Sequence, residues 1–308
     1  VFERLGLVVV DEQHRFGVRQ RNKLLNKGLQ PHLLTMTATP IPRTLALTLH
    51  GDLDVSQLDE LPPGRTPINT QLISPKDKKY AYELIRSEIN KGHQIYVVLP
   101  LIEESEKLEL SSAVDVHHKL SSEIFSEFSV ELLHGKMKSV EKQEVIRNFL
   151  EKKSDILVST TVIEVGVDVP NASVMLIEDS DRFGLAQLHQ LRGRVGRGAS
   201  KSYCLLSHQN KNKLSRQRLE VLANSNDGFE ISEIDLRFRG PGQVLGTKQS
   251  GLPDFALASL VDDVEILELA RDEAQNILDT DPTLSHNTML RLLIKDQWEK
   301  LKIGNKLN

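Results

Sequence analysis

Apolar and polar positions in the first sixty residues follow two patterns, one typical of strands and one typical of helices. The apolar run 5–10 predicts a buried strand, and the wider spacing over 18–27 predicts a helix. A second strand is predicted over 33–36, with another helix after Pro42. Strands that alternate with helices are typical of a parallel α/β sheet. The Pro- and Gly-rich stretch 61–67 then indicates an interdomain linker.

The same alternation restarts after this linker. A helix is predicted over 76–91, because Ala81, Ile85 and Ile89 form an apolar stripe together with Leu84, and Gly92 ends it. The polar, acidic segment 102–113 is interpreted as a surface excursion. Further strands are predicted over 94–99, 130–133, 156–159, 174–178 and 202–206, and further helices over 140–152 and 185–192.

Beyond about residue 214 the pattern becomes helical. The clearest helix is 262–278, with Asp262 at the N-cap position and Glu265 at N3. We therefore expect an α/β fold with two doubly wound lobes, the first incomplete, followed by a mainly helical C-terminal region. The predicted domains are 1–66, 67–214 and 215–308.

Composition narrows the class of protein. The chain has 308 residues, of which 39% are hydrophobic and 27% charged, as in a water-soluble globular protein. No apolar run approaches the roughly 20 residues that would span a bilayer. The only cysteine, Cys204, excludes an internal disulfide, suits a reducing cytoplasm, and is expected in the core rather than in catalysis.

The net charge of −4 hides two basic blocks without acidic residues. These blocks are 13–51 and 182–219, whereas acids gather at 103–109 and 262–273. Because a polyanion responds to local charge, the blocks indicate anionic partners such as nucleic acid. Solvated surface faces are the alternative.

Two adjacent carboxylates, Asp11 and Glu12, directly follow the first predicted strand. Ligands of α/β sheets bind at the carboxyl ends of strands. There one carboxylate can hold Mg²⁺, directly or through water, while the other orients or deprotonates the water that attacks a γ-phosphate. A helix cap or an ordinary surface pair is the alternative for this motif alone.

Hydroxyl groups follow two other predicted strands. Thr37 and Thr39 could bond the neighbouring acidic pair and relay its state, although a turn would have the same composition. Thr160 and Thr161 could contact a nucleic-acid phosphate. Asp168, seven residues later, could bond a ribose hydroxyl, with a capped strand-to-helix turn as the alternative.

Arginines interleaved with glycines fill segment 187–198. Glycines at this spacing let the backbone pack closely, while the guanidinium groups of Arg194 and Arg197 can point at one anionic site. Such groups can stabilise the charge of a transferring γ-phosphate. A generic basic loop is the alternative.

In this order the motifs resemble those of a superfamily 2 helicase: an acid pair followed by His14, a Thr-Ala-Thr motif, a Gly166–Asp168 motif, and Gln-x-x-Gly-Arg-x-Gly-Arg. Within that superfamily the chain is similar to the RecG family. The matching stretches are 11–18, 37–44 and 183–190, and the match fades after about residue 251.

The resemblance implies two RecA-like lobes, ATP and Mg²⁺ as cofactors, and a residue set for each task. The implied catalytic residues are Asp11, Glu12, His14, Gln190, Arg194 and Arg197, with Mg²⁺ at Asp11 and Glu12 through water. Gly166, Asp168, Arg194 and Arg197 would bind ATP. The implied DNA-binding or coupling residues are Thr37, Thr39, Arg43, Thr160, Thr161, Arg239 and Gln249.

The Arg- and Gly-rich segment 227–251 resembles the family's translocation motif, in which a hairpin carrying Arg239 couples lobe closure to movement along duplex DNA. A short helix is expected to end at its Gly-Pro-Gly turn. The transcription-repair coupling factor shares this motif and is the alternative. Gln13 within the acid-pair motif and the acidic excursion favour RecG.

RecG enzymes remodel branched DNA, reversing stalled forks and moving Holliday junctions in recombination and repair. The resemblance therefore implies branched double-stranded DNA as the partner, with single-strand DNA-binding protein as a further candidate. It also implies a monomer in the cytoplasm, associated with the nucleoid, and no membrane role.

A phosphate-binding Gly-x-x-x-x-Gly-Lys-[Ser/Thr] loop is absent from the sequence. The strand-like run so close to Val1 also leads us to expect further residues before it in the native protein. The family's wedge domain has no counterpart here. We expect this chain alone to be inactive. A DNA-binding fragment without its own activity is the alternative function.

Overall fold

The computed structural model describes residues 2, 4–12, 23–28, 31–38, 54–58, 60, 66–100, 106–160, 169–198, 201–209, 212–239 and 263–304. The chain divides into two compact units, 1–40 with 59–231 and 41–58 with 232–308. Within the described ranges, no helix is long and apolar enough to cross a membrane.

The N-terminal segment contains a small parallel sheet of β1 (Leu7–Val10) and β2 (His32–Thr35). Both strands were predicted and are confirmed. Successive side chains of a strand point to opposite faces, and Val10 is buried while Val9 is 50% exposed. Of the predicted helix 18–27, residues 23–25 are helical, and 18–22 lie outside the described residues, as does the start of the helix expected after Pro42.

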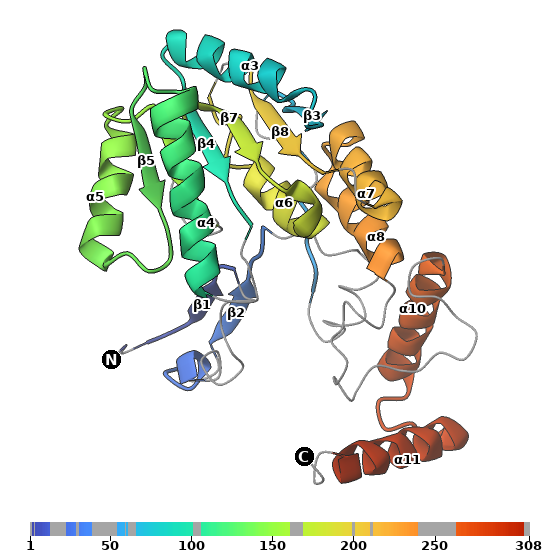
Figure 1. The fold of residues 1–308 in the computed structure, drawn as a ribbon. Coiled ribbons are helices and arrows are strands. Elements are labelled where there is room, and N and C mark those ends of the chain that lie inside the picture. Colours follow the sequence, from blue (N-terminus) through green and yellow to red (C-terminus); the bar gives the residue numbers. More distant parts are fainter. Residues whose placement is uncertain are drawn as a thin grey trace. The chain divides into compact units, whose positions relative to one another are not determined.

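A six-stranded, wholly parallel sheet forms the centre of the next segment, with the strand order β3-β8-β7-β4-β6-β5 (Figure 1). This confirms the predicted doubly wound lobe. Its strands are β3 (Asn69–Ile73), β4 (Gln94–Val98), β5 (Val130–Leu133), β6 (Ile156–Ser159), β7 (Ala172–Ile177) and β8 (Tyr203–Ser207).

Strand β3 was not predicted. Its sequence, Asn-Thr-Gln-Leu-Ile, has no continuous apolar run, because it lies at the sheet edge and pairs only with β8. Only Ile73 of this strand is fully buried. An edge strand with a polar face carries a weaker hydrophobic signal than the central strands.

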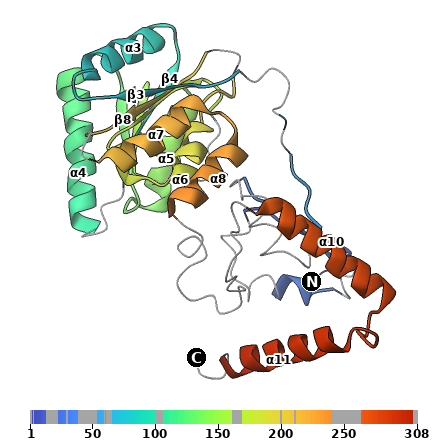
Figure 2. The same cartoon turned by 90° about the vertical axis from the view of Figure 1, so that its right-hand side faces the viewer.

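Helices cover both faces of this sheet (Figure 2). On one face lie α3 (Lys78–Asn90), α4 (Glu106–Lys119) and the short η2 (Leu120–Ile124). The other face is covered by α5 (Ser139–Leu150), α6 (Leu185–Arg192) and α7 (Lys213–Asn224). On that second face the Phe149 ring packs against Tyr96, with ring centroids 5.1 Å apart.

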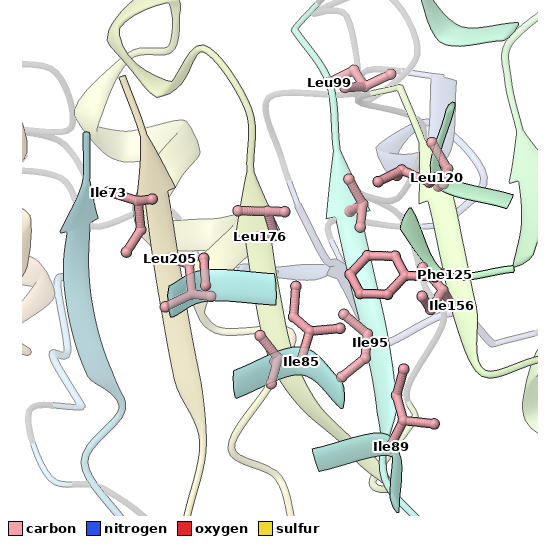
Figure 3. Packing of buried hydrophobic residues seen from close by; sticks show 14 of the residues in the cluster. Ile73, Ile85, Ile89, Ile95, Leu99, Leu120, Phe125, Ile156, Leu176 and Leu205 are labelled. Atoms are coloured by element: carbon pink, nitrogen blue, oxygen red, sulfur yellow. The ribbon is translucent and has the colours of Figure 1, made fainter. Parts of the chain in front are cut away.

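The core of the first face is a continuous apolar layer (Figure 3). Ile85 and Ile89 of α3 pack onto Ile95 of β4, and Phe125 packs beside Ile156 of β6. The predicted apolar stripe of α3 is thus confirmed. Burial of such side chains contributes about 1.5–3 kcal/mol each, which fixes the sheet and the edges where its strands end.

The interpretation of 102–113 as a surface excursion was wrong from residue 106 onward. Helix α4 begins at Glu106, and residues 102–105 lie outside the described part. Ala113 is 1% exposed and packs in the core with Val116 and Leu120. These apolar positions recur three and four residues apart and bury one side of the helix, a signal that the acidic residues before them obscured.

Helices follow β8, as predicted. They are α7, α8 (Gly228–Arg239), α10 (Val264–Thr280) and α11 (Thr288–Gly304). The N-cap of α10 is Asp263 rather than the predicted Asp262, and its side chain makes no capping hydrogen bond. Helix α8 is described up to Arg239, and the predicted Gly-Pro-Gly turn after it lies outside the described residues.

One carboxylate holds the turn between α10 and α11. Asp281 accepts hydrogen bonds from the backbone amides of Ser285, His286 and Asn287, and from the side chains of Ser285 and Asn287. Burial acts to raise the pKa of Asp281, but these bonds outweigh it and lower the pKa to about 2.

A buried carboxylate ties α3 to the sheet. Glu88 is 2% exposed and accepts from Lys91 Nζ at 2.6 Å, from Ser173 Oγ at 3.1 Å, and contacts His93 Nδ1 at 2.8 Å. Burial acts to raise the pKa of Glu88, but the hydrogen bonds outweigh it, so the pKa lies below its ordinary value of 4.5.

We predict that Glu88→Gln lowers the free energy of unfolding by about 1–3 kcal/mol at pH 7, since it leaves the buried Ser173 hydroxyl and the half-buried His93 without an anionic partner. A carboxylate with a lowered pKa stabilises the fold above its unfolded pKa, and this contribution disappears as pH falls through the folded pKa. Urea denaturation at pH 7 and at acidic pH measures both effects. The exposed Glu144→Gln is the control, and an equal loss from both variants would contradict the prediction.

Candidate functional site

The acid pair lies at the carboxyl edge of the small parallel sheet. β1 and β2 end side by side, with Val10 opposite Thr35, and Val10 O accepts a hydrogen bond from Met36 N at 2.8 Å. Asp11 and Thr37 therefore lie at the same carboxyl edge of this sheet. The structure thus brings together two of the motifs that the sequence separates by about 25 residues.

Glu12 adopts a left-handed backbone conformation with φ of +49°. Its amide donates to Asp11 Oδ1 at 2.9 Å, so the two acidic residues form one tight turn. Non-glycine residues in this conformation are strained by about 1–3 kcal/mol, and they cluster at active sites. Oxygen ligands from one or two carboxylates, completed by water and substrate phosphates, are what Mg²⁺ prefers, so the pair fits the predicted metal.

Thr160 directly follows β6, at the carboxyl edge of the six-stranded sheet. Its side chain is 1% exposed, and Thr160 Oγ1 has no hydrogen-bond partner among the described residues. The preceding Ser159 Oγ donates to the Thr160 carbonyl at 2.6 Å, which fixes the backbone there. Leaving a buried hydroxyl unbonded costs about 1–3 kcal/mol, which a phosphate oxygen as acceptor would relieve.

Helix α6 carries the arginine-rich segment away from that edge. Leu185, Leu188 and Leu191 are buried and hold the helix on the sheet. The predicted residues Gln190 and Arg194 are half-buried. Arg197 is exposed and donates from Nε to Gly193 O at 3.4 Å. We call residues 193–198, which follow α6, the arginine turn.

Two glycines allow the arginine turn to pack closely, as predicted. Gly196 has φ of +78°, and a Cβ there would lie 2.9 Å from Ile68 Cγ1. A Cβ on Gly198 would lie 2.7 Å from the Pro170 carbonyl oxygen. The arginine turn therefore packs closely against the backbone at Pro170 and against the side chain of Ile68.

Arg192 differs from its neighbours in the same segment. It is 2% exposed, and its Nη1 donates to the carbonyls of Leu222 and Ser225, both at 2.7 Å. Its guanidinium therefore points into the protein, between α6 and α7, which lie side by side (Figure 1). Sequence reasoning gave this arginine no separate role, because the pattern of arginines and glycines does not distinguish it.

A crevice of about 200 Å³ opens at the carboxyl ends of β4 and β7, between α3 and α4. In it Glu178 accepts from Lys78 Nζ at 3.0 Å and from Ser207 Oγ at 2.7 Å. Burial acts to lower the pKa of Lys78, but the carboxylate of Glu178 outweighs it and raises the pKa. Sequence reasoning missed Glu178, although a carboxylate directly after an apolar strand is the signal that identified Asp11.

Several predicted site residues lie outside the described part of the chain: His14, Thr39, Arg43, Thr161, Gly166, Asp168 and Gln249. The side chain of Arg239 is likewise outside it. The roles of all these residues stay predictions, as do those of Gln190, Arg194 and Arg197.

Two family models match the chain. The helicase conserved C-terminal domain matches residues 76–199, and the model "ATP-dependent DNA helicase RecG, domain 3, C-terminal" matches residues 225–306. The first model therefore contains most of the six-stranded sheet, α6 and the arginine turn. The second model begins at Ser225, in the short segment between α7 and α8.

Curated relatives and a solved structure agree with these models. The ATP-dependent DNA helicase RecG of Synechocystis sp. is 61% identical over 98% of this chain and 36% of its own length. That of Bacillus subtilis is 51% identical over 91% of this chain and 41% of its own length. A structure of RecG bound to a three-way DNA junction matches with 47% identity and a TM-score of 0.68, over 87% of this chain and 34% of that one.

We predict that Gly198→Ala displaces the arginine turn, because its Cβ would approach Pro170 O far inside van der Waals contact. We expect a loss of about 1–3 kcal/mol in the free energy of unfolding. Chemical denaturation measures it. Gly135→Ala is the matched control, since nothing lies within 4 Å of its Cβ. Equal stability of the two variants would refute the close contact.

Proposed function

Because the chain belongs to the RecG family of DNA helicases, we propose that it forms the C-terminal part of an ATP-driven translocase that remodels branched double-stranded DNA. The observation that carries the proposal is the match to RecG bound to a three-way DNA junction, at 47% identity over most of the chain. Reversal of stalled forks and migration of Holliday junctions are the proposed reactions.

The described residues support a division of labour in ATP hydrolysis. Asp11 and Glu12 would hold Mg²⁺ through water and orient the attacking water, since both follow β1 at the edge where α/β sheets bind ligands. Mg²⁺ neutralises charge on the transferring phosphate when it is bound. Arg194 and Arg197 would contact the γ-phosphate, and Gln190 would sense it.

The DNA side of the function rests on other residues. The buried hydroxyl of Thr160, which has no hydrogen-bond partner among the described residues, fits a phosphate oxygen of the nucleic acid. The acid-free blocks 13–51 and 182–219 provide local positive charge in an acidic chain. Helix α8 leads directly into the segment that resembles the translocation motif, where Arg239 and Gln249 would act.

The chain spans about 35–41% of the length of the relatives it matches. The sequence 1–308 contains no phosphate-binding loop, so we propose that the complete protein supplies this loop and a wedge domain. A monomeric, cytoplasmic protein associated with the nucleoid, together with single-strand DNA-binding protein as a further partner, completes the proposal.

We predict that Glu12→Gln in the complete protein lowers ATP turnover by about 10²–10⁴-fold, because the amide cannot act as the general base. Nucleotide affinity should change little, since Gln keeps the size and polarity of Glu. Steady-state ATPase rates and binding of a fluorescent ATP analogue measure the two quantities. The exposed Glu83→Gln is the control, and unchanged turnover in Glu12→Gln would refute the assignment.

We also predict that the complete protein regresses model replication forks with ATP, whereas chain 1–308 alone neither hydrolyses ATP nor unwinds DNA. The reason is that the β- and γ-phosphates need a loop and a lysine that the chain does not contain. A gel-based fork-regression assay and a phosphate-release assay test both statements. Substantial DNA-stimulated ATPase from the chain alone would contradict the second.

A further inference from the structure

Arg192 joins the last turn of α6 to the end of α7. Its Nη1 donates to Leu222 O and to Ser225 O, and lies 3.5 Å from Thr70 Oγ1. Its Nη2 contacts His189 Nδ1 at 2.9 Å. The last carbonyls of a helix have no partner within the helix, and a cation there is favoured by the helix dipole. Arg192 therefore caps α7 from the neighbouring helix.

The charge of Arg192 is buried without an acidic counterpart. None of its hydrogen-bonding partners in the described part of the chain is a carboxylate: they are two carbonyls, a hydroxyl and an imidazole. Burial lowers the pKa of this arginine. If Arg192 served only to fill space, an apolar side chain would fill the same position at a lower cost in desolvation free energy. The planar guanidinium instead spans several backbone acceptors at once, which keeps them in one geometry.

Ser225 connects Arg192 to α8 through hydrogen bonds. Its carbonyl accepts from Arg192, while its hydroxyl donates to Glu230 and accepts from Asp227 N at 3.1 Å. Asp227 Oδ1 in turn accepts from Phe229 N at 2.8 Å, in the first turn of α8. Hydrogen bonds thus connect Arg192 to the beginning of α8 through one serine.

We propose that Arg192 is a positioning residue that couples the arginine turn to α8, so that a displacement of Arg194 and Arg197 towards ATP moves the start of α8. The inference rests on the proposed function. Arg192 precedes Gly193, the first residue of the arginine turn, so the two move together as one backbone segment. Helix α8 transmits the displacement because it is continuous to Arg239, where the segment resembling the translocation motif continues.

The test uses three variants of the complete protein. Arg192→Met removes the hydrogen bonds and keeps a long side chain, while Ser225→Ala removes only the hydroxyl between α7 and α8. We expect both to retain DNA-stimulated ATP hydrolysis within about threefold, and to lower the duplex length translocated per ATP by about tenfold or more. Arg218→Met is the matched control, since Arg218 also donates to a carbonyl, Phe183 O at 2.8 Å, away from the segment between α7 and α8.

Amide hydrogen exchange gives a readout that is independent of turnover. A non-hydrolysable ATP analogue should change the exchange of the Phe229 and Glu230 amides in the unchanged protein and in Arg218→Met, but not in Arg192→Met. Exchange that responds equally in Arg192→Met, or a proportional loss of hydrolysis and translocation, would overturn the proposal and leave Arg192 a structural residue. Absence of ATP hydrolysis from the unchanged complete protein would contradict the proposed function itself, which separates the two failures.

Discussion

The strands of a parallel sheet are apolar on both faces, so both faces must be covered by other side chains. The helices of the crossover connections provide this cover. The six-stranded sheet meets this requirement with α3 and α4 on one face and α5, α6 and α7 on the other. Several polar residues of functional interest consequently lie where strands and helices end. Thr160 and Glu178 lie at the carboxyl edge, and the arginine turn follows α6 on its way to β8.

The central elements could be predicted because burial on both sides leaves continuous apolar runs. The predicted bounds of β5, β6 and α6 agree with the structure. Strand β3 and helix α4 were not predicted, because an edge strand and a helix that begins with acidic residues carry little apolar signal. The positions of Asp11 and Thr37 at one edge also followed from the pattern, since parallel strands align their carboxyl ends.

The division of roles among the arginines could not be predicted. Arg192 and Arg194 are two residues apart in the same motif, yet one binds carbonyls of α7 and the other is half-buried at the turn. That difference depends on where residues 222 and 225 place their carbonyl oxygens, which is a property of the folded chain. The basic block 182–219 is divided in the same way. Arg216 pairs with Glu220 at 2.9 Å and Arg218 binds a backbone carbonyl, so only part of the block is available to an anion.

The turn at Asp281 has a practical consequence. A pKa of about 2 means that this carboxylate keeps its charge, and the turn its five hydrogen bonds, at any pH that a cell experiences. Hydrogen bonds to Asp281 hold the turn that joins α10 to α11, the two helices at the C-terminal end of the chain in Figure 2. A spectroscopic label on the exposed side of α11, for instance at Met289, would report the orientation of α10 as well, which makes this turn a convenient place from which to follow the C-terminal region during a catalytic cycle.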